Sequence, residues 1–218
     1  MTPTLNWEAR LTGDDPDQQV ADTMNLMVGY VREDAHSPVV LEAALEAAPS
    51  PDPAEIIEGV FHYVRDLIRF QHDTAIAAPL DSQLAKAGLA EVPVVEVLIR
   101  PRDLLTWRRD TGRGPVGDCD DYAMLTAALL KARGVEANFV TVAADPSHPQ
   151  QFSHVYVAAY PPGGRVALDT SHGAYAGWEV ENVGRREEWS IGAGLTGLLL
   201  VGLVIWALVG MHRRRRTS

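Results

Sequence analysis

Apolar residues recur at helical spacing in the N-terminal part of the chain. A first helix, capped by Asp15 or Asp17, is predicted to run to about Glu33, because a carboxylate at a helix start accepts hydrogen bonds from the first backbone N–H groups. Its apolar face consists of Val20, Met24, Met27 and Val31. A second helix is predicted over Pro38–Ala48. Residues 1–50 are therefore expected to form a helical N-terminal extension.

The proline cluster at residues 49–53 interrupts this pattern and marks the best boundary in the chain. A strongly amphipathic helix is predicted over Pro53–Phe70, with proline in the first turn, where its missing N–H costs no hydrogen bond. Its apolar stripe consists of Ile56, Ile57, Val60, Phe61, Val64, Leu67 and Ile68. Beyond it, Val92–Ile99 is either a strand interrupted by Pro93 or a loop over a groove.

The next part of the chain predicts one or two helical turns at Arg102–Arg108, a longer helix and then three strands. The longer helix begins near Cys119 and ends at Arg133 and Gly134, since glycine suits the left-handed position that follows a helix. The strand-like segments are Ala137–Ala143, Phe152–Tyr160 and Arg165–Asp169. The joint between the last two is short, so they should pair as an antiparallel hairpin.

These elements predict an α+β fold, in which helices come first and a small antiparallel sheet packs on the helix that begins at Cys119. The domain built around this helix is expected to span residues 51–183, followed by a linker at residues 184–190. No internal repeat is visible in the sequence.

The C-terminal part of the chain has the pattern of a membrane-spanning helix. Residues 191–211 contain no charged side chain, and roughly twenty apolar residues suffice to cross a bilayer core. The basic tail at 212–218, with Arg213–Arg216, predicts a cytoplasmic C-terminus under the positive-inside rule. A buried core helix is the alternative, although such a helix normally keeps a polar face. The start of the chain lacks the pattern of a secretory signal peptide.

The charge of the chain argues against a nucleic-acid-binding surface. The 218 residues carry a formal net charge of −10, and without the terminal arginine cluster 15 basic groups remain against 29 acidic ones, or −14. Nucleic-acid binding requires clustered cations. The single cysteine excludes an internal disulfide and any zinc site built from several cysteines. We expect no cofactor and no metal.

The lone cysteine, Cys119, lies where a glycine-containing loop turns into an apolar helix. The positive end of a helix dipole favours the thiolate form, although a lone cysteine is more often a small buried apolar residue. His154 and Asp169 lie on the two strands predicted to pair, so the carboxylate can orient the imidazole. Nucleophile, base and orienting group are the three parts that thiol catalysis requires.

The same residues resemble the transglutaminase-like superfamily, which shares its core with papain-type cysteine proteases. The matching segments are Gly117–Asp121 before a helix, Arg133–Val135 before a strand, Ser153–Val157, Leu168–Thr170 and the upstream Tyr63–Phe70. The resemblance covers roughly residues 53–180. It implies a papain-like core and a catalytic triad of Cys119, His154 and Asp169. Within the superfamily, the chain is most similar to members encoded in the structural gene clusters of tailed phages; a membrane-anchored bacterial member is the other possibility.

This resemblance implies acyl transfer through a thioester, with hydrolysis or transamidation as its outcome and a protein or peptide as its substrate. Family members often add an upstream oxyanion donor, and Trp107 is the nearest candidate, although it could equally pack beside Leu104 and Leu105. We expect a cysteine peptidase or amidase, tethered to a membrane through residues 191–211 or associated with a virion. The alternative is a structural or assembly module that keeps the fold, performs no chemistry and assembles into a larger particle.

Other charged residues near the cysteine have ordinary explanations. Asp118, Asp120 and Asp121 lack the alternating oxygen ligands of a calcium loop, and carboxylates in a first helical turn usually stabilise the helix. Arginines gather before the cysteine, at positions that suit either attraction of an acidic substrate or a solvated loop; they are Arg100, Arg102, Arg108, Arg109 and Arg113. His148 and His172 are expected in exposed turns near strand ends.

Overall fold

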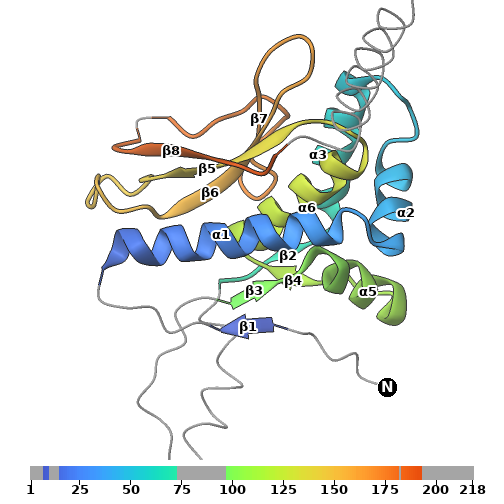
Figure 1. The fold of residues 1–218 in the computed structure, drawn as a ribbon, viewed down its shortest axis with the longest axis horizontal. Coiled ribbons are helices and arrows are strands. Elements are labelled where there is room, and N and C mark those ends of the chain that lie inside the picture. Colours follow the sequence, from blue (N-terminus) through green and yellow to red (C-terminus); the bar gives the residue numbers. More distant parts are fainter. Residues whose placement is uncertain (1–6, 10–14, 73–96, 182, 193–218) are drawn as a thin grey trace, which may run out of the picture.

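The computed structural model describes residues 7–9, 15–72, 97–181 and 183–192 (Figure 1). In these residues the helices are α1 (Pro16–Asp34), α2 (Pro38–Ala47), α3 (Pro53–Leu67), α5 (Pro101–Thr111) and α6 (Cys119–Ala132). The strands are β1 (Trp7–Ala9), β2 (Arg69–Phe70), β3 (Val97–Ile99), β4 (Val116–Gly117), β5 (Ala137–Val142), β6 (His154–Ala159), β7 (Val166–Leu168) and β8 (Arg186–Ser190).

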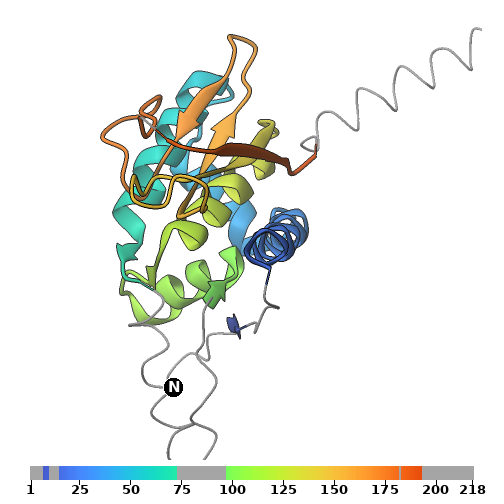
Figure 2. The same ribbon diagram turned by 90° about the vertical axis from the view of Figure 1, so that its left-hand side faces the viewer.

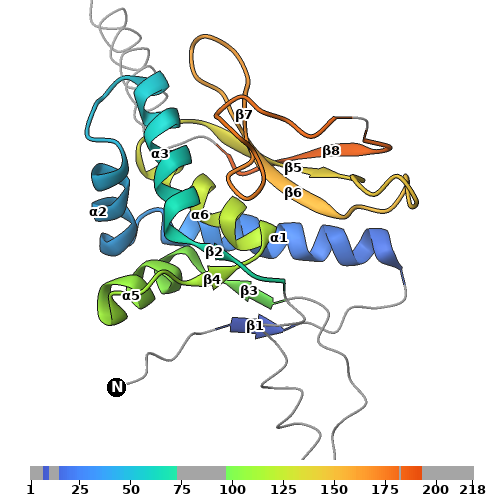
Figure 3. The same ribbon diagram turned by 180° about the vertical axis from the view of Figure 1, so that it is seen from behind.

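Helix α6 forms the centre of the fold. Every residue from Asp120 to Lys131 is buried, because α6 contacts α1, α2, α3 and α5 as well as strands β5 and β6. Figures 1 and 3 show the larger sheet on one side of α6 and helix α5 with the short strands on the other. Figure 2 shows α1 end-on beside this arrangement. A helix surrounded in this way needs apolar side chains on all its faces, as the sequence of α6 provides.

The larger sheet has the strand order β7-β6-β5-β8, and all its neighbours are antiparallel. One face packs on α6 through Phe139, Val155, Val157 and Leu168. The other face carries Val140, Val142, Tyr156, Ala158 and Ala167, against which Val180 and Val183 pack. Two small sheets complete the fold, an antiparallel pair of β1 and β3 and a parallel pair of β2 and β4.

The structure confirms the α+β class and most of the predicted elements. Asp15 caps α1 by accepting from the Asp17 N–H (3.0 Å), and Gly134 after α6 has a φ of 77°. The predicted hairpin is present, with Val157 opposite Leu168. Helix α3 is shorter than expected, because Arg69 and Phe70 leave it to pair with Val116 and Gly117. Residues 186–190, expected within a linker, form β8 on the edge of the sheet.

Helices α1 and α2, expected as an extension, contribute to the same core as the domain that follows. Met24, Met27 and Val31 of α1 and Val40 of α2 are buried in one cluster with α3 and α6. The proline cluster at 49–53 lies between α2 and α3, which pack against each other.

The predicted membrane-spanning segment at 191–211 lies outside the described residues from position 193 onward. Among the residues that the structure describes, no helix has the length and apolar character needed to cross a bilayer.

Candidate active site

Cys119 is the first residue of α6, directly after its N-cap residue Asp118. The Asp118 carboxylate accepts a hydrogen bond from the Asp120 N–H (3.2 Å). The Cys119 side chain is partly exposed, and its thiol donates to Asp120 Oδ1 (3.7 Å). The thiol is therefore located at the positive end of the α6 dipole, but with a carboxylate beside it.

Asp121 has a structural role at the same helix start. Its carboxylate is fully buried and accepts from the Ile99 N–H of β3 (2.7 Å) and from the Asp118 N–H (3.3 Å). These bonds close a capping box and join β3 to the first turn of α6. The acidic residues around Cys119 thus stabilise the helix start, as the sequence indicated.

The Asp121 side chain leaves no room for a side chain at position 117, which is occupied by glycine. A β-carbon at Gly117 would lie 2.6 Å from Asp121 Oδ2 and 2.7 Å from Asp121 Cβ. We expect Gly117→Ala to lower the free energy of unfolding by about 1–3 kcal/mol, the usual cost of overpacking. Urea denaturation measures the change.

Gly29 offers a matched control for this variant. It lies inside α1 with no atom within 4 Å of an added β-carbon, so Gly29→Ala should raise stability by about 0.5–1 kcal/mol through higher helix propensity. Equal effects of the two variants would contradict the proposed crowding at Asp121.

His154 and Asp169 form the second part of the site. His154 is the first residue of β6, opposite Val142 of β5, and Asp169 directly follows β7. The His154 Nε2 atom lies 2.7 Å from Asp169 Oδ2, with the two side chains 10% and 1% exposed. Next to Asp169, Thr170 Oγ1 lies 2.9 Å from Thr126 Oγ1 of α6. The aspartate end of the pair is thus fixed to the helix that carries the cysteine.

The Asp169 carboxylate is ionised in this environment. Burial raises its pKa, but the hydrogen bond and charge of His154, the His172 N–H (2.9 Å) and the Ser171 hydroxyl (2.9 Å) together hold the pKa below its ordinary value. An ionised carboxylate only accepts hydrogen bonds. His154 therefore donates from Nε2, and in the neutral ring the acceptor is Nδ1, the tautomer that a general base requires.

Cys119 and His154 line the same pocket, which has a volume of about 470 Å³. Its lining residues are Phe70, His72, Asp118, Cys119, Ala144, Asp145, Ser153, His154, Asp169, His172, Trp178 and Val180. The structure thus brings together all three predicted catalytic residues. Trp107 belongs to α5 and does not belong to this lining; its role as an oxyanion donor stays a prediction. The indole in the pocket is that of Trp178.

His172 is a residue of the site that sequence reasoning left among the exposed turns. It is exposed, as expected, but its ring makes edge contacts with His154 and Phe70, each at 5.0 Å between centroids. Burial, and then the charges of His154 and His72, lower its pKa against the opposing effect of Asp169. The only sequence signal was its position three residues after Asp169.

Two groups of side chains could supply ligands to a metal ion. Among the described residues, His154, Asp169 and His172 offer ligand atoms within 4.8 Å of one another, and so do Asp118, Cys119 and Asp120. In the first group, His154 Nε2 already donates to Asp169, which is the geometry of an imidazole–carboxylate pair. In the second, the carboxylate of Asp118 caps α6.

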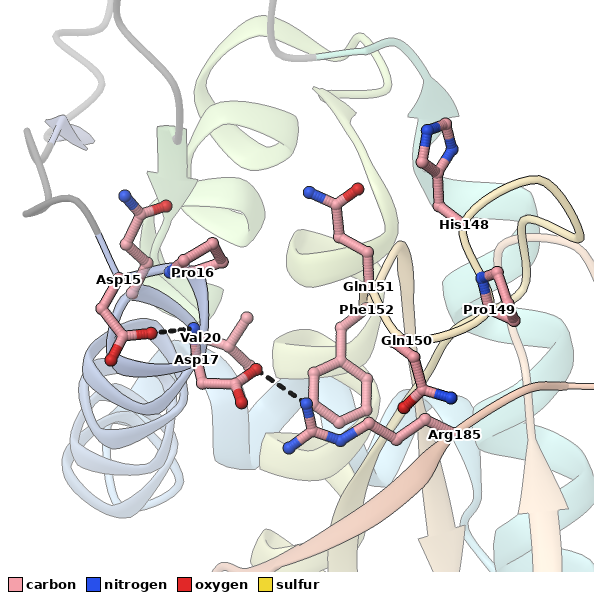
Figure 4. A pocket seen from close by; sticks show the side chains of 11 residues that line it. Asp15, Pro16, Asp17, Val20, His148, Pro149, Gln150, Gln151, Phe152 and Arg185 are labelled. Atoms are coloured by element: carbon pink, nitrogen blue, oxygen red, sulfur yellow. Dashed lines mark hydrogen bonds and ion pairs between the residues drawn. The ribbon is translucent and has the colours of Figure 1, made fainter.

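A second pocket, of about 630 Å³, opens between the start of α1 and the segment that joins β5 to β6 (Figure 4). Arg185 lies in it, 2.7 Å from Asp17 and 4.3 Å from the ring centre of Phe152. Its lining contains Gln150 and Gln151 but no thiol. The predicted catalytic residues therefore lie in the other pocket, that of Cys119.

No model of a known protein family matches the sequence. A search of curated proteins also finds no match.

Proposed function

We propose that the chain is a thiol-dependent enzyme that transfers acyl groups from amide bonds, and that it acts as a cysteine peptidase or amidase. The observation that carries this proposal is the shared pocket of Cys119 and the His154–Asp169 pair. We further propose a papain-like, transglutaminase-like core. A cysteine helix that packs on an antiparallel sheet, with the histidine on β6 and the aspartate directly after the neighbouring β7, supports this assignment.

In the proposed reaction, His154 Nδ1 takes the proton of the Cys119 thiol, and the sulfur attacks the carbonyl carbon of an amide. The resulting oxyanion would be stabilised at the N-terminus of α6, by the helix dipole and the Cys119 N–H. The imidazolium then returns its proton to the leaving amine, the C–N bond breaks, and a thioester remains. Water, deprotonated by His154, hydrolyses the thioester and regenerates the thiol.

Covalent labelling tests this proposal without knowledge of the substrate. A peptide amide that carries a thiol-directed electrophile should modify Cys119 in the wild type, and Cys119→Ser should remain unmodified. We expect His154→Ala to slow the modification by about 10²-fold, the lower end of what a general base contributes. Intact-protein mass spectrometry against time measures the rate. Equal rates for wild type and His154→Ala would contradict a catalytic pair.

One observation favours a non-catalytic structural module as the second candidate. The Cys119 thiol contacts the Asp120 carboxylate, and a nearby negative charge opposes thiolate formation. Under this alternative, Cys119→Ser would leave the biological activity intact. The labelling experiment separates the two candidates, because a structural module would show no acceleration by His154.

A further inference from the structure

The pocket of Cys119 has an acidic lining. Besides Asp169, which His154 engages, it contains the carboxylates of Asp118 and Asp145, and among the described residues none in the lining is lysine or arginine. Two of the arginines that precede the cysteine have carboxylate partners elsewhere: Arg100 and Arg102 form ion pairs with Glu33 and Asp34 of α1.

Each of the two carboxylates is held next to a residue of the proposed reaction. Asp118 directly precedes Cys119 as the N-cap of α6. Asp145 lines the same pocket as His154, and its backbone is held by the residue before His154, because the N–H groups of Ala144 and Asp145 both donate to the hydroxyl of Ser153 (3.0 and 3.2 Å). A positively charged group in the pocket would therefore lie close to the reacting atoms.

The Asp145 carboxylate keeps its charge over a wide pH range. Hydrogen bonds from the Ser147 hydroxyl and from His148, and then from the Ser147 N–H, lower its pKa to about 2. The lowered pKa of His172 keeps that ring neutral at neutral pH. At neutral pH Asp145 thus contributes a negative charge to the pocket, and His172 contributes no positive charge to offset it.

The rest of the lining suits the apolar part of a long cationic side chain. Phe70, Ala144, Trp178 and Val180 contribute apolar surface. Lysine and arginine bury their methylene stems on such surfaces while their charged ends reach carboxylates, and an indole attracts a cation through its ring face.

We propose that this pocket selects peptides with a lysine or arginine side chain next to the reacting amide, with Asp118 and Asp145 as its counter-charges. The inference rests on the proposed acyl-transfer function and adds the class of its substrate. Norleucine matches the lysine stem but lacks the charge, so it separates the electrostatic contribution from the apolar one.

The test uses internally quenched peptide libraries in which the positions beside each scissile bond carry lysine, norleucine or glutamate. We expect kcat/KM in the order lysine, norleucine, glutamate, with lysine favoured over norleucine about tenfold, since a single screened charge pair contributes on the order of this factor. The preference should shrink as salt is raised from 0.05 to 0.5 M, roughly as the screening length shortens. Equal rates for lysine and norleucine, or a preference for glutamate, would overturn the inference.

Two variants remove charge and keep the hydrogen-bonding shape. Asp145→Asn and Asp118→Asn should each lower the ratio of kcat/KM for the lysine peptide to that for the norleucine peptide, because each removes one negative charge from the pocket. The local structure should be kept, since asparagine can still accept the turn and cap hydrogen bonds. Glu136→Gln is the control. Glu136 is exposed and directly precedes β5, so it lies at one end of the β5–β6 pair, whereas His154 lies at the other end. It should leave the ratio unchanged.

A binding measurement distinguishes failure of this inference from failure of the proposed function. Titration of Cys119→Ser with lysine and norleucine peptides, followed by calorimetry, reports selection by charge without any turnover. Tighter binding of the lysine peptide would support the inference even if no peptide were cleaved, in which case only the acyl-transfer function fails. Turnover of peptides without a lysine preference in either measurement would overturn the inference and leave the function in place.

Discussion

Replacement of Asp169 by asparagine is expected to lower kcat/KM by about 10⁴-fold while the fold is retained, as for the orienting aspartate of other nucleophile–histidine–aspartate sites. The Asp169 carboxylate accepts from His154 Nε2 at 2.7 Å and thereby selects the ring tautomer with Nδ1 as the acceptor. An asparagine amide can present an N–H to the same nitrogen, which would reverse the tautomer. Steady-state cleavage of the best library peptide measures the loss.

Ser171→Ala is the control for this prediction. The Ser171 hydroxyl donates to Asp169 Oδ1 (2.9 Å), the oxygen that does not contact His154. Its removal should cost no more than about 10²-fold in kcat/KM, since a single hydrogen bond to a charged group contributes about 1.5–3 kcal/mol. A similar loss in both variants would indicate that Asp169 acts by general stabilisation of the turn rather than by orienting His154.

The contribution of the Asp169 carboxylate to the stability of the fold should depend on pH in a defined direction. The pKa of Asp169 is lowered in the folded protein, so its ionisation stabilises the fold above the ordinary carboxyl pKa of about 3.9. This contribution is lost as the pH falls through the lowered folded-state pKa. Asp169→Asn should therefore flatten the acid side of the stability curve, which thermal melts between pH 2 and 6 would show (about 0.5-unit steps suffice to follow one titration).

Local sequence signals predicted the helices well, because each depends on residues close together in the chain. The cap of α1, the proline in the first turn of α3 and the glycine after α6 are of this kind. Strand β8 was missed, since its pattern Arg186–Ser190 is highly charged and its place is set by pairing with β5, where the partners Asn138 and Ser190 lie 52 residues apart in the chain. Strands β2 and β4 were missed for the same reason, because each is two residues long and is a strand only through its pairing with the other.

The site was predictable to the extent that its residues lie on recognisable elements. Cys119, His154 and Asp169 follow from a helix start and a hairpin, and the structure brings all three to one pocket. Asp145 and Trp178 line the same pocket from turns, and no periodic pattern places a turn residue relative to a distant helix. The pocket's charge, which carries the substrate inference, was therefore beyond sequence reasoning.

The partners of the arginines before the cysteine were also not predictable from the sequence, because these partners lie on a distant helix. Arg100 and Arg102 suggested either a solvated loop or an attraction for acidic substrates, and the structure directs both to α1. Asp34 is fully buried and lies 2.6 Å from Arg100 Nη2 and 3.3 Å from Arg100 Nε, while the Arg102 N–H donates to it at 3.2 Å. This pair joins α1 to the start of α5, and through it to β3.

We expect Arg100→Ala to lower the free energy of unfolding by about 3–5 kcal/mol, because it leaves the buried Asp34 charge without its partner. Urea denaturation at neutral pH measures the change. Arg109→Ala is the matched control: its ion pair with Asp110 is exposed, and its removal should cost less than about 1 kcal/mol.

The double variant Asp34→Leu with Arg100→Met separates the charge from the packing. Both charges are removed and the apolar volume is largely kept, so most of the stability lost in Arg100→Ala should return, as happens when buried ion pairs are replaced by apolar residues. If the double variant were as unstable as Arg100→Ala, the loss would come from packing and from the Arg102 N–H left without an acceptor. Restored stability would assign the cost to the uncompensated Asp34 carboxylate, and so give Arg100 a structural role as the partner of this buried charge.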